Sequence, residues 1–145
     1  MPADDEAFRE ALGQSARDRA VAVFDELVGW ARAGGLVLQR ARRETSTKGP
    51  ELYFRSSEEG PAVFSVLGNG DLLVQVRWLK NHSALKNRLD ELAENLANVP
   101  GVCWKRDPKK LGFPNVALAA LDPSTSLRNL LIVFDWIIDQ LARGA

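Results

Sequence analysis

The residues with the clearest capacity for chemistry lie in the stretch GNGDLLVQVRWLK, residues 68–80. In this stretch Asp71 precedes Gln75, and Arg77 follows Gln75 after one intervening residue. Metal-dependent hydrolysis of a phosphodiester needs carboxylates to hold the divalent ion and a lysine beside the attacking water. Gln75 offers only a neutral carbonyl oxygen, and Arg77 carries a proton that it does not give up. We therefore predict that the stretch contains no catalytic residue and no metal ligand.

The same stretch nevertheless resembles a hairpin of many metal-dependent nucleases, in which Gly-Asp is followed by an apolar residue and then Glu-x-Lys. The resemblance implies a nuclease relative that has lost the acid and the lysine. In those nucleases the aspartate and the Glu-x-Lys usually lie on successive strands, whereas Asp71 lies in the turn. A plain hairpin explains the same residues, because alternation places Leu72, Val74, Val76 and Trp78 on one face and Leu73, Gln75 and Arg77 on the other.

Basic side chains gather at the end of this stretch and in a later loop. The candidates for contact with nucleic acid are Arg77, Lys80, Lys105, Arg106, Lys109 and Lys110. Because Trp78 and Trp104 are near them in the sequence, these cations could pair with phosphates while a base stacks on an indole ring. Charged side chains usually face solvent without binding anything, and tryptophans in strands are usually part of the core. A nucleic-acid partner is therefore the second of two hypotheses.

Other chemistry lacks the residues that it would need. His82 is the only histidine and Cys103 the only cysteine, so neither a histidine-based zinc site nor a Ser-His or Cys-His relay can be assembled. We therefore expect no cofactor. The single cysteine cannot form an intrachain disulfide, and the first residues, MPADDEAFRE, lack the basic and apolar parts of a secretory signal. Both observations predict a cytoplasmic protein.

The composition is that of a folded domain. The 145 residues are enough for one domain, and 46% of them are hydrophobic while 26% are charged. The 19 basic and 19 acidic residues cancel, so any affinity for nucleic acid must come from a local patch. The most apolar run, Leu130 to Ile138, is about half as long as a membrane span and contains Asp135. We expect this run to be a buried element and expect no membrane partner.

Around these residues the sequence predicts a single α+β domain, residues 14–145, which follows a mobile N-terminal arm, residues 1–13. A first helix ends at Gly34-Gly35 and carries one apolar face. Strands are expected at Leu36 to about Arg42, Glu51 to Arg55, Ala62 to Leu67 and Asp71 to Leu79. Asn69-Gly70 predicts a two-residue turn with positive φ at both positions, which pairs residues 63–67 antiparallel with residues 72–76.

The second half of the chain is expected to add two helices. Leucines from Leu85 to Leu96 recur at helical spacing, and Pro100-Gly101 ends that helix. Strands could form at Val102 to Trp104 and at Asn115 to Leu121, before a last helix from about Leu127 to Ala142. The order α-β-β-β-β-α-β-α predicts an antiparallel meander sheet of four to five strands backed by three helices. The predicted common core is Leu85, Leu89, Leu92, Leu96, Phe134 and Ile138 packed against Val74, Val76 and Trp78.

The last helix is apolar on more than one side. Seven apolar residues from Leu127 to Leu141 form one wide face, and Ile132, Val133 and Trp136 lie largely outside it. A helix of this kind must be covered on more than one side. Either the first helix covers the second side or another subunit does, so Ile132, Val133 and Trp136 are the candidates for a homodimer interface.

The order of these features resembles an uncharacterised bacterial α+β domain of unknown function, found alone or near restriction-type nucleases. The resemblance rests on a first helix ending in Gly-Gly, a meander ending in VQVRWLK, a helix ending in Val-Pro-Gly-Val, an apolar strand and a last helix that bears a tryptophan. The element order is also similar to that of small dimeric α+β chaperones that bind secreted effectors. These resemblances favour a non-catalytic interaction or accessory module that self-associates. The alternative is a nucleic-acid-associated module, including a degenerate relative of metal-dependent nucleases.

Overall fold

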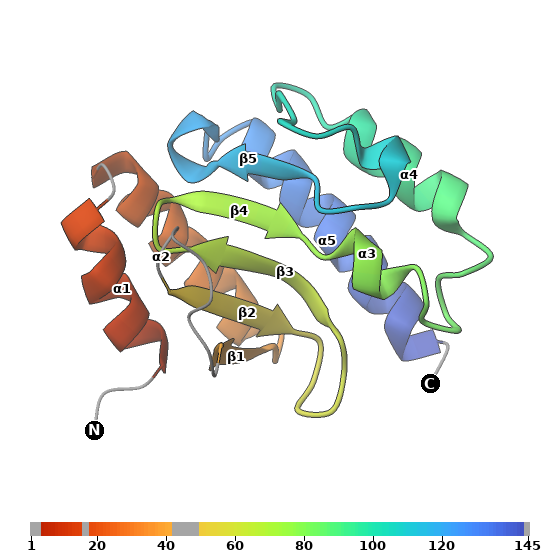
Figure 1. The fold of residues 1–145 in the computed structure, drawn as a ribbon, viewed down its shortest axis with the longest axis horizontal. Helices are drawn as coiled ribbons and strands as arrows, with labels where there is room; N and C mark the ends of the chain where they lie inside the picture. The colour runs from red at the N-terminus through yellow and green to blue at the C-terminus, as the bar shows by residue number, and fades with distance from the viewer. Residues whose placement is uncertain (1–3, 16–17, 42–49, 144–145) are drawn as a thin grey trace.

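The structure is a computed structural model that describes residues 4–15, 18–41 and 50–143 (Figure 1). Its helices are α1 (Asp4–Ser15), α2 (Asp18–Ala33), α3 (Val76–Leu79), α4 (Leu89–Ala97) and α5 (Ser126–Arg143), with short 3-10 helices η1 (Pro108–Lys110) and η2 (Leu118–Ala120). Its strands are β1 (Val37–Arg40), β2 (Glu51–Arg55), β3 (Ala62–Leu67), β4 (Asp71–Val74) and β5 (Asn115–Ala117). The fold is α+β, which confirms the predicted class.

The strands form one antiparallel sheet in the order β1-β2-β3-β4-β5, so each strand pairs with the next strand in the sequence. This is the predicted meander, with five strands. β2 and β3 begin and end at the predicted residues. The register places Leu52 opposite Val66 and Phe54 opposite Phe64, and an irregularity follows between Phe54 and Arg55.

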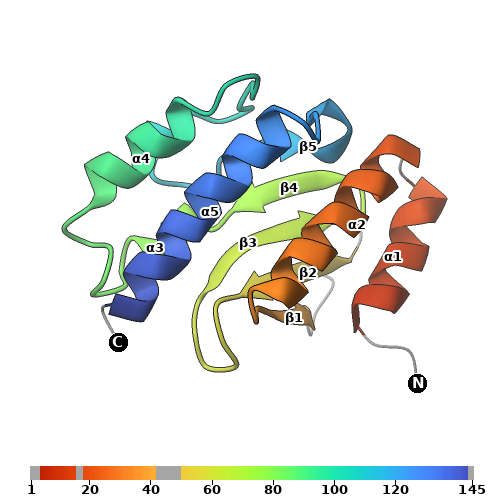
Figure 2. The same ribbon diagram turned by 180° about the vertical axis from the view of Figure 1, so that it is seen from behind.

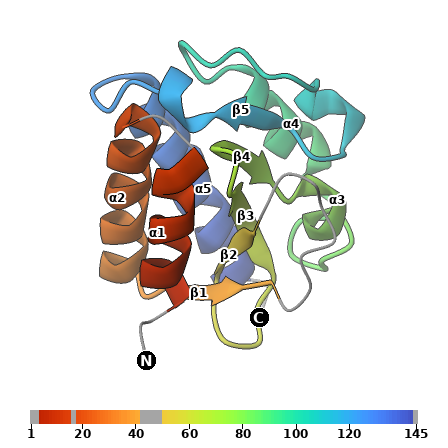
Figure 3. The same ribbon diagram turned by 60° about the vertical axis from the view of Figure 1, so that its left-hand side comes forward.

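Two long helices cover one face of the sheet. Figure 2 shows α2 and α5 side by side across the strands, with α1 next to α2. Figure 3 shows the same layers from the side, with α4 beyond β5, where it contacts α5. Among the described residues, the opposite face of the sheet carries no comparable helix, and only the short α3 lies at the end of β4 (Figure 1).

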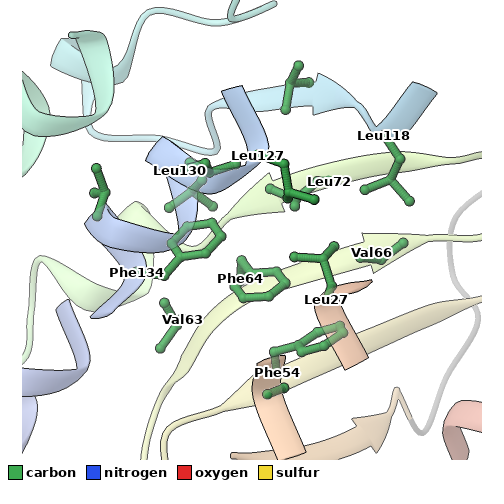
Figure 4. Packing of buried hydrophobic residues seen from close by; sticks show 14 of the residues in the cluster. Leu27, Phe54, Val63, Phe64, Val66, Leu72, Leu118, Leu127, Leu130 and Phe134 are labelled. Carbon is green, nitrogen blue, oxygen red and sulfur yellow. The ribbon is translucent and has the colours of Figure 1, made fainter. Parts of the chain in front are cut away.

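A stack of aromatic rings joins the sheet to the helices. Phe64 lies between Phe54 and Phe134, and both pairs of ring centroids are 4.3 Å apart with interplanar angles of 19° and 10°. Figure 4 shows the three rings between the strands and α5. The ring of Trp30, on α2, lies 6.1 Å from the rings of both Phe64 and Phe134. Since aromatic side chains bury large apolar areas, this cluster fixes β2, β3, α2 and α5 against one another.

The end of α2 confirms the predicted glycine cap. Gly35 has a φ of 75°, in the left-handed region that glycine adopts without a steric cost. The backbone N–H of Gly35 donates to Arg32, and that of Leu36 donates to Ala31. These two bonds form the Schellman motif that is common at helix C-termini, and the chain then continues into β1.

The residues predicted to form an N-terminal arm, 1–13, are helical where the structure describes them. Asp4–Ser15 form α1, in which Phe8 and Leu12 are fully buried. The ring of Phe8 lies 5.4 Å from that of Phe24, and Arg9 forms a two-bond ion pair with Asp25 at 2.8 and 3.0 Å. A short helix with few large apolar residues has only a weak periodic pattern, so its packing against α2 was not evident from the sequence.

The turn between β3 and β4 differs from the expected two-residue turn. Among the turn residues, Gly70 has a positive φ of 97° whereas Asn69 does not. Gly70 donates its N–H to Leu67 at 2.9 Å, and the Asn69 side chain accepts from the N–H of Asp71. The pairing of Ser65 with Leu73 confirms the antiparallel hairpin but leaves a longer loop. The asparagine therefore stabilises the turn with its side chain and does not adopt the left-handed conformation.

Several boundaries in the second half of the chain also differ. Val102 to Trp104 do not form a strand, and β5 ends at Ala117, after which η2 begins at Leu118. α4 begins at Leu89, so Leu85 lies in the turns before the helix, although it is fully buried. The predicted core is confirmed for Val74, Val76, Leu85, Leu92, Leu96 and Phe134, all of which are fully buried. Leu89 and Ile138 are half-buried, and Trp78 is exposed.

Within the described residues, none of the helices combines the length and the apolar character that a membrane crossing requires.

Leu92 provides a test of this core. Its side chain has no exposed surface, so Leu92→Ala should lower the free energy of unfolding by about 2 to 5 kcal/mol, because it removes buried methyl groups and leaves a cavity. Leu89→Ala, at a half-buried position on the same helix, is the matched control and should cost clearly less. Denaturant unfolding of both variants is the measurement. Equal losses for the two would show that the buried face of α4 is assigned incorrectly.

Candidate functional site

Gln75 marks the point where the sheet ends and α3 begins. Its backbone N–H donates to Val63 at 3.0 Å, and its backbone carbonyl accepts from Trp78 and Leu79 at 3.1 and 2.9 Å. The alternation of side chains between the two faces of a strand therefore ends at Val74, and the helical turn of α3 begins at Val76. The predicted alternation is wrong beyond this point: Gln75 is only 3% exposed, whereas Trp78 is 62% exposed.

A chain of polar side chains lies on the sheet face opposite α2 and α5. Gln75 Nε2 donates to Ser65 Oγ at 2.9 Å, and Ser65 Oγ donates to Glu51 Oε2 at 2.6 Å. The Tyr53 hydroxyl donates to Glu51 Oε1 at 3.2 Å. Tyr53 and Ser65 are cross-strand partners, and their neighbours Phe54 and Phe64 point into the core, so these polar groups face the other way.

The same face contains a pocket of about 430 Å³. We call it the Arg55 pocket, and its larger lining side chains are Gln39, Arg40, Tyr53, Arg55, Gln75 and Trp78. Two of these side chains are cationic, two are aromatic, and none is acidic. A volume of this size lies within the range of pockets that hold small ligands.

Arg55 is held in the pocket by neutral acceptors. Its Nε donates to the Gly60 carbonyl at 3.0 Å, and its Nη1 donates to Gln39 Oε1 at 2.8 Å. Guanidinium has five N–H donors, so three are left for other partners. Within the described part of the chain Arg55 forms no ion pair. The guanidinium is thus fixed in orientation, and none of the described carboxylates neutralises its charge.

The six predicted basic residues do not form one patch. Lys105, Arg106 and Lys110 lie around a second hollow of about 380 Å³, which we call the basic hollow, together with Asp107, Gly112 and Phe113. Lys109 lies instead beside acidic residues of α4, Asp90, Glu91 and Glu94. Arg77 and Lys80 are on or next to α3, and the Arg77 N–H donates to Gly112 at 2.9 Å. This bond places α3 between the Arg55 pocket and the basic hollow.

The two predicted stacking tryptophans have different environments. The Trp104 Nε1–H donates to the Leu96 carbonyl at 2.8 Å, and the ring packs against the core, so Trp104 is a structural residue. Trp78 is instead one of two large apolar side chains that are exposed among the described residues, the other being Ile132. Only Trp78 therefore presents an indole at a pocket mouth.

Asp71 and Gln75 lie too far apart to share a metal. Asp71 is the first residue of β4 and Gln75 follows its last, so the rise of a strand separates their Cα atoms by about 13 Å. Asp71 Oδ1 forms an ion pair with Lys105 at 2.8 Å, and the Gln75 amide is bonded to Ser65. Residues 4–15, 18–41 and 50–143 also contain no cluster of His, Cys, Asp and Glu suited to a metal ion.

The predicted interface residues have unequal exposure. Val133 is 9% exposed and belongs to the core, and Trp136 is partly buried against it. Ile132 is 59% exposed. Packing within the chain thus accounts for Val133 and for part of Trp136, and leaves Ile132 as the exposed apolar residue of α5.

Sequence reasoning did not identify the Arg55 pocket. The signal was present in ELYFR, residues 51–55, where alternation places Glu51, Tyr53 and Arg55 on the face opposite Leu52 and Phe54. Alternation could not predict that Trp78 lies beside this face in the pocket, because the position of Trp78 depends on the turn at Gln75. His82, the only histidine of the sequence, accepts a hydrogen bond from the Ala84 N–H on its Nδ1 and so stabilises a turn.

Comparison with known proteins finds no family model, no curated protein and no solved structure that matches this chain.

Tyr53 can be tested directly, because it is the only tyrosine of the chain. Burial, followed by the charge and hydrogen bond of Glu51, raises the pKa of Tyr53 above its ordinary value of 10.0. Ultraviolet absorbance should therefore show that the phenol loses its proton at a higher pH in the folded chain than in the unfolded chain. Glu51→Gln should lower the pKa because only the effect of burial persists, and an unchanged midpoint would contradict the assigned contact.

This raised pKa also sets a direction for stability. A folded-state pKa above the unfolded value means that the native chain holds the phenol proton more tightly. The associated stability is fully present below the unfolded pKa of about 10 and is lost as pH rises through the folded pKa.

We expect no cleavage of plasmid or single-stranded DNA in magnesium or manganese. The reason is the separation of Asp71 from Gln75 and the engagement of both side chains in other bonds. Gel electrophoresis after prolonged incubation is the measurement. Cleavage that persists through purification and disappears in Asp71→Ala would overturn this prediction.

Proposed function

We propose that this chain is a non-catalytic interaction module, whose main contact surface is the sheet face around α3. The observation that carries the proposal is Trp78, whose 62% exposed indole stands at the mouth of the Arg55 pocket. Exposure of a large aromatic ring has no benefit for the isolated fold, because the ring would be more stable if buried. Tryptophan and arginine are also the residues that most often dominate the energy of an interface.

The engagement of the polar groups supports the non-catalytic part of the proposal. Ser65 is fully buried and bonded to Glu51, so its hydroxyl is not accessible to a substrate. Asp71 is paired with Lys105, and His82 serves a turn. Each of these three groups therefore already has a structural partner.

The sheet edges argue for contact through side chains and not through an added strand. At the β1 edge, the outward N–H of Arg40 donates to Asp4 Oδ2 at 3.0 Å. At the β5 edge, the outward carbonyl of Asn115 accepts from the Lys105 N–H at 2.9 Å. A partner strand would have to break these bonds. This distinguishes the proposed module from proteins that hold an extended partner as an extra strand.

We also propose that the module forms a homodimer through α5. Ile132 supports this, since it is exposed and lies one turn from the half-buried Trp136. A cytoplasmic location is part of the same proposal, and a lone cysteine, Cys103, suits a reducing compartment.

A nucleic-acid-associated module is the second candidate, and the distribution of charge favours it. The chain has no net charge, yet cations lie on both sides of α3: Arg40 and Arg55 in one pocket, and Lys105, Arg106 and Lys110 in the basic hollow. Phosphate contacts of this kind would give an affinity that falls steeply with salt.

Sedimentation velocity tests the self-associating module. The wild-type chain should sediment as a dimer at micromolar concentration, and Ile132→Glu should be monomeric because it places a charge in the apolar contact. Trp78→Ser is the matched control, since Trp78 is about as exposed as Ile132 but lies on α3. A monomeric wild-type chain would contradict self-association. A dimer that is lost only in Trp78→Ser would move the interface to α3.

A further inference from the structure

We propose that the Arg55 pocket binds a nucleotide unit, with the phosphate on Arg55 and the base on the ring of Trp78. This inference deepens the proposed function, because it uses the same surface, and it names the chemistry of what is bound. The argument rests on three features of the pocket: a fixed and unneutralised cation, an exposed indole at the mouth, and hydrogen-bond acceptors between them.

The first feature is the cation of Arg55. Arg55 is oriented by Gly60 and Gln39, which are neutral, so its remaining donors can form charge-assisted bonds with an anion. Because these bonds leave the guanidinium fixed before a ligand arrives, little side-chain freedom is lost on binding. Arg40 also lines the pocket, and none of the lining side chains that the structure describes is acidic. A phosphate carries more negative charge than a carboxylate and so forms stronger charge-assisted bonds with the Arg55 guanidinium.

The indole supplies the second feature. Trp78 lines the pocket while most of its surface is exposed, so a flat ring can lie on it without displacing core residues. Stacking of a base on an aromatic side chain is the usual way in which proteins hold single nucleotides of any sequence.

The third feature is a pair of acceptors. Tyr53 uses its hydroxyl proton on Glu51, so the phenol oxygen can accept a hydrogen bond but not readily donate one. Gln75 also lines the pocket; it donates one of its two amide N–H groups to Ser65, and its Oε1 is an acceptor. Both groups favour a base with an exocyclic amine, which carries two donors. Adenosine 5′-monophosphate is therefore the probe of choice.

The experiment follows the indole N–H resonances of the ¹⁵N-labelled full chain. The chain has four tryptophans, and the resonance of Trp78 is the one missing from the spectrum of Trp78→Phe. Titration with adenosine 5′-monophosphate should shift this resonance saturably. Adenosine, which lacks the phosphate, should bind at least about tenfold more weakly, since it forms no charge-assisted bond with Arg55.

Two variants separate the pocket from general effects. Arg55→Gln should bind the nucleotide no better than the wild-type chain binds adenosine, and its unchanged remaining spectrum would show that it is folded. Ile132→Ser, on α5, should bind like the wild-type chain. The proposal is overturned if neither nucleotide nor oligonucleotide moves the Trp78 resonance, if Arg55→Gln binds as well as the wild type, or if benzoate binds as tightly as the nucleotide.

A single-stranded oligodeoxyadenylate distinguishes the two sources of a nucleotide unit. Much tighter, salt-dependent binding of the strand than of the mononucleotide would indicate nucleic acid that continues over α3 to the basic hollow. Similar affinity for both would indicate a free nucleotide. Sedimentation of the same samples separates this inference from the proposed function. A dimer that binds none of the nucleotides would support the interaction module and contradict the nucleotide site.

Discussion

The hydrogen bond from Gln75 to Ser65 determines where the sheet stops and therefore where its contact surface begins. A buried amide is costly unless its donors and acceptors are satisfied. Ser65 satisfies the Gln75 donor and is itself satisfied by Glu51, which also accepts from Tyr53. With the side chain held in this way, the backbone carbonyl of Gln75 is free to close the first turn of α3. That turn carries Trp78 out of the core and to the mouth of the Arg55 pocket.

The two faces of the sheet have different roles in the molecule. The face under α2 and α5 holds the aromatic stack of Phe54, Phe64 and Phe134, which gives the fold its packed centre. The opposite face holds the polar chain and the two arginines of the pocket. Alternation along β2 alone places Phe54 and Tyr53 on these different faces. β2 thus contributes Leu52 and Phe54 to the core and Tyr53 and Arg55 to the pocket.

Much of the fold followed from local signals, and the exceptions have physical causes. β2, β3 and the cap at Gly35 were predicted because turn residues and alternation are properties of the chain nearby. α1 was missed because its stability comes from the contact of Phe8 with Phe24 and from the Arg9–Asp25 ion pair, which are tertiary. The strand predicted to run through Trp78 failed because Gln75 has a partner, Ser65, on another strand. The candidate site was predicted less well for the same reason, since it joins residues from β1, β2 and α3.

The most direct test of this account is amide hydrogen exchange in Gln75→Leu. The N–H groups of Trp78 and Leu79 donate to the Gln75 carbonyl, and that of Leu92 donates to Arg88 in α4. If the side chain of Gln75 holds the turn, exchange at Trp78 and Leu79 should accelerate by about tenfold or more, the effect of losing roughly one buried hydrogen bond. Exchange at Leu92 should stay as it is in the wild-type chain. Unchanged protection at Trp78 and Leu79 in this variant would contradict the central role of Gln75.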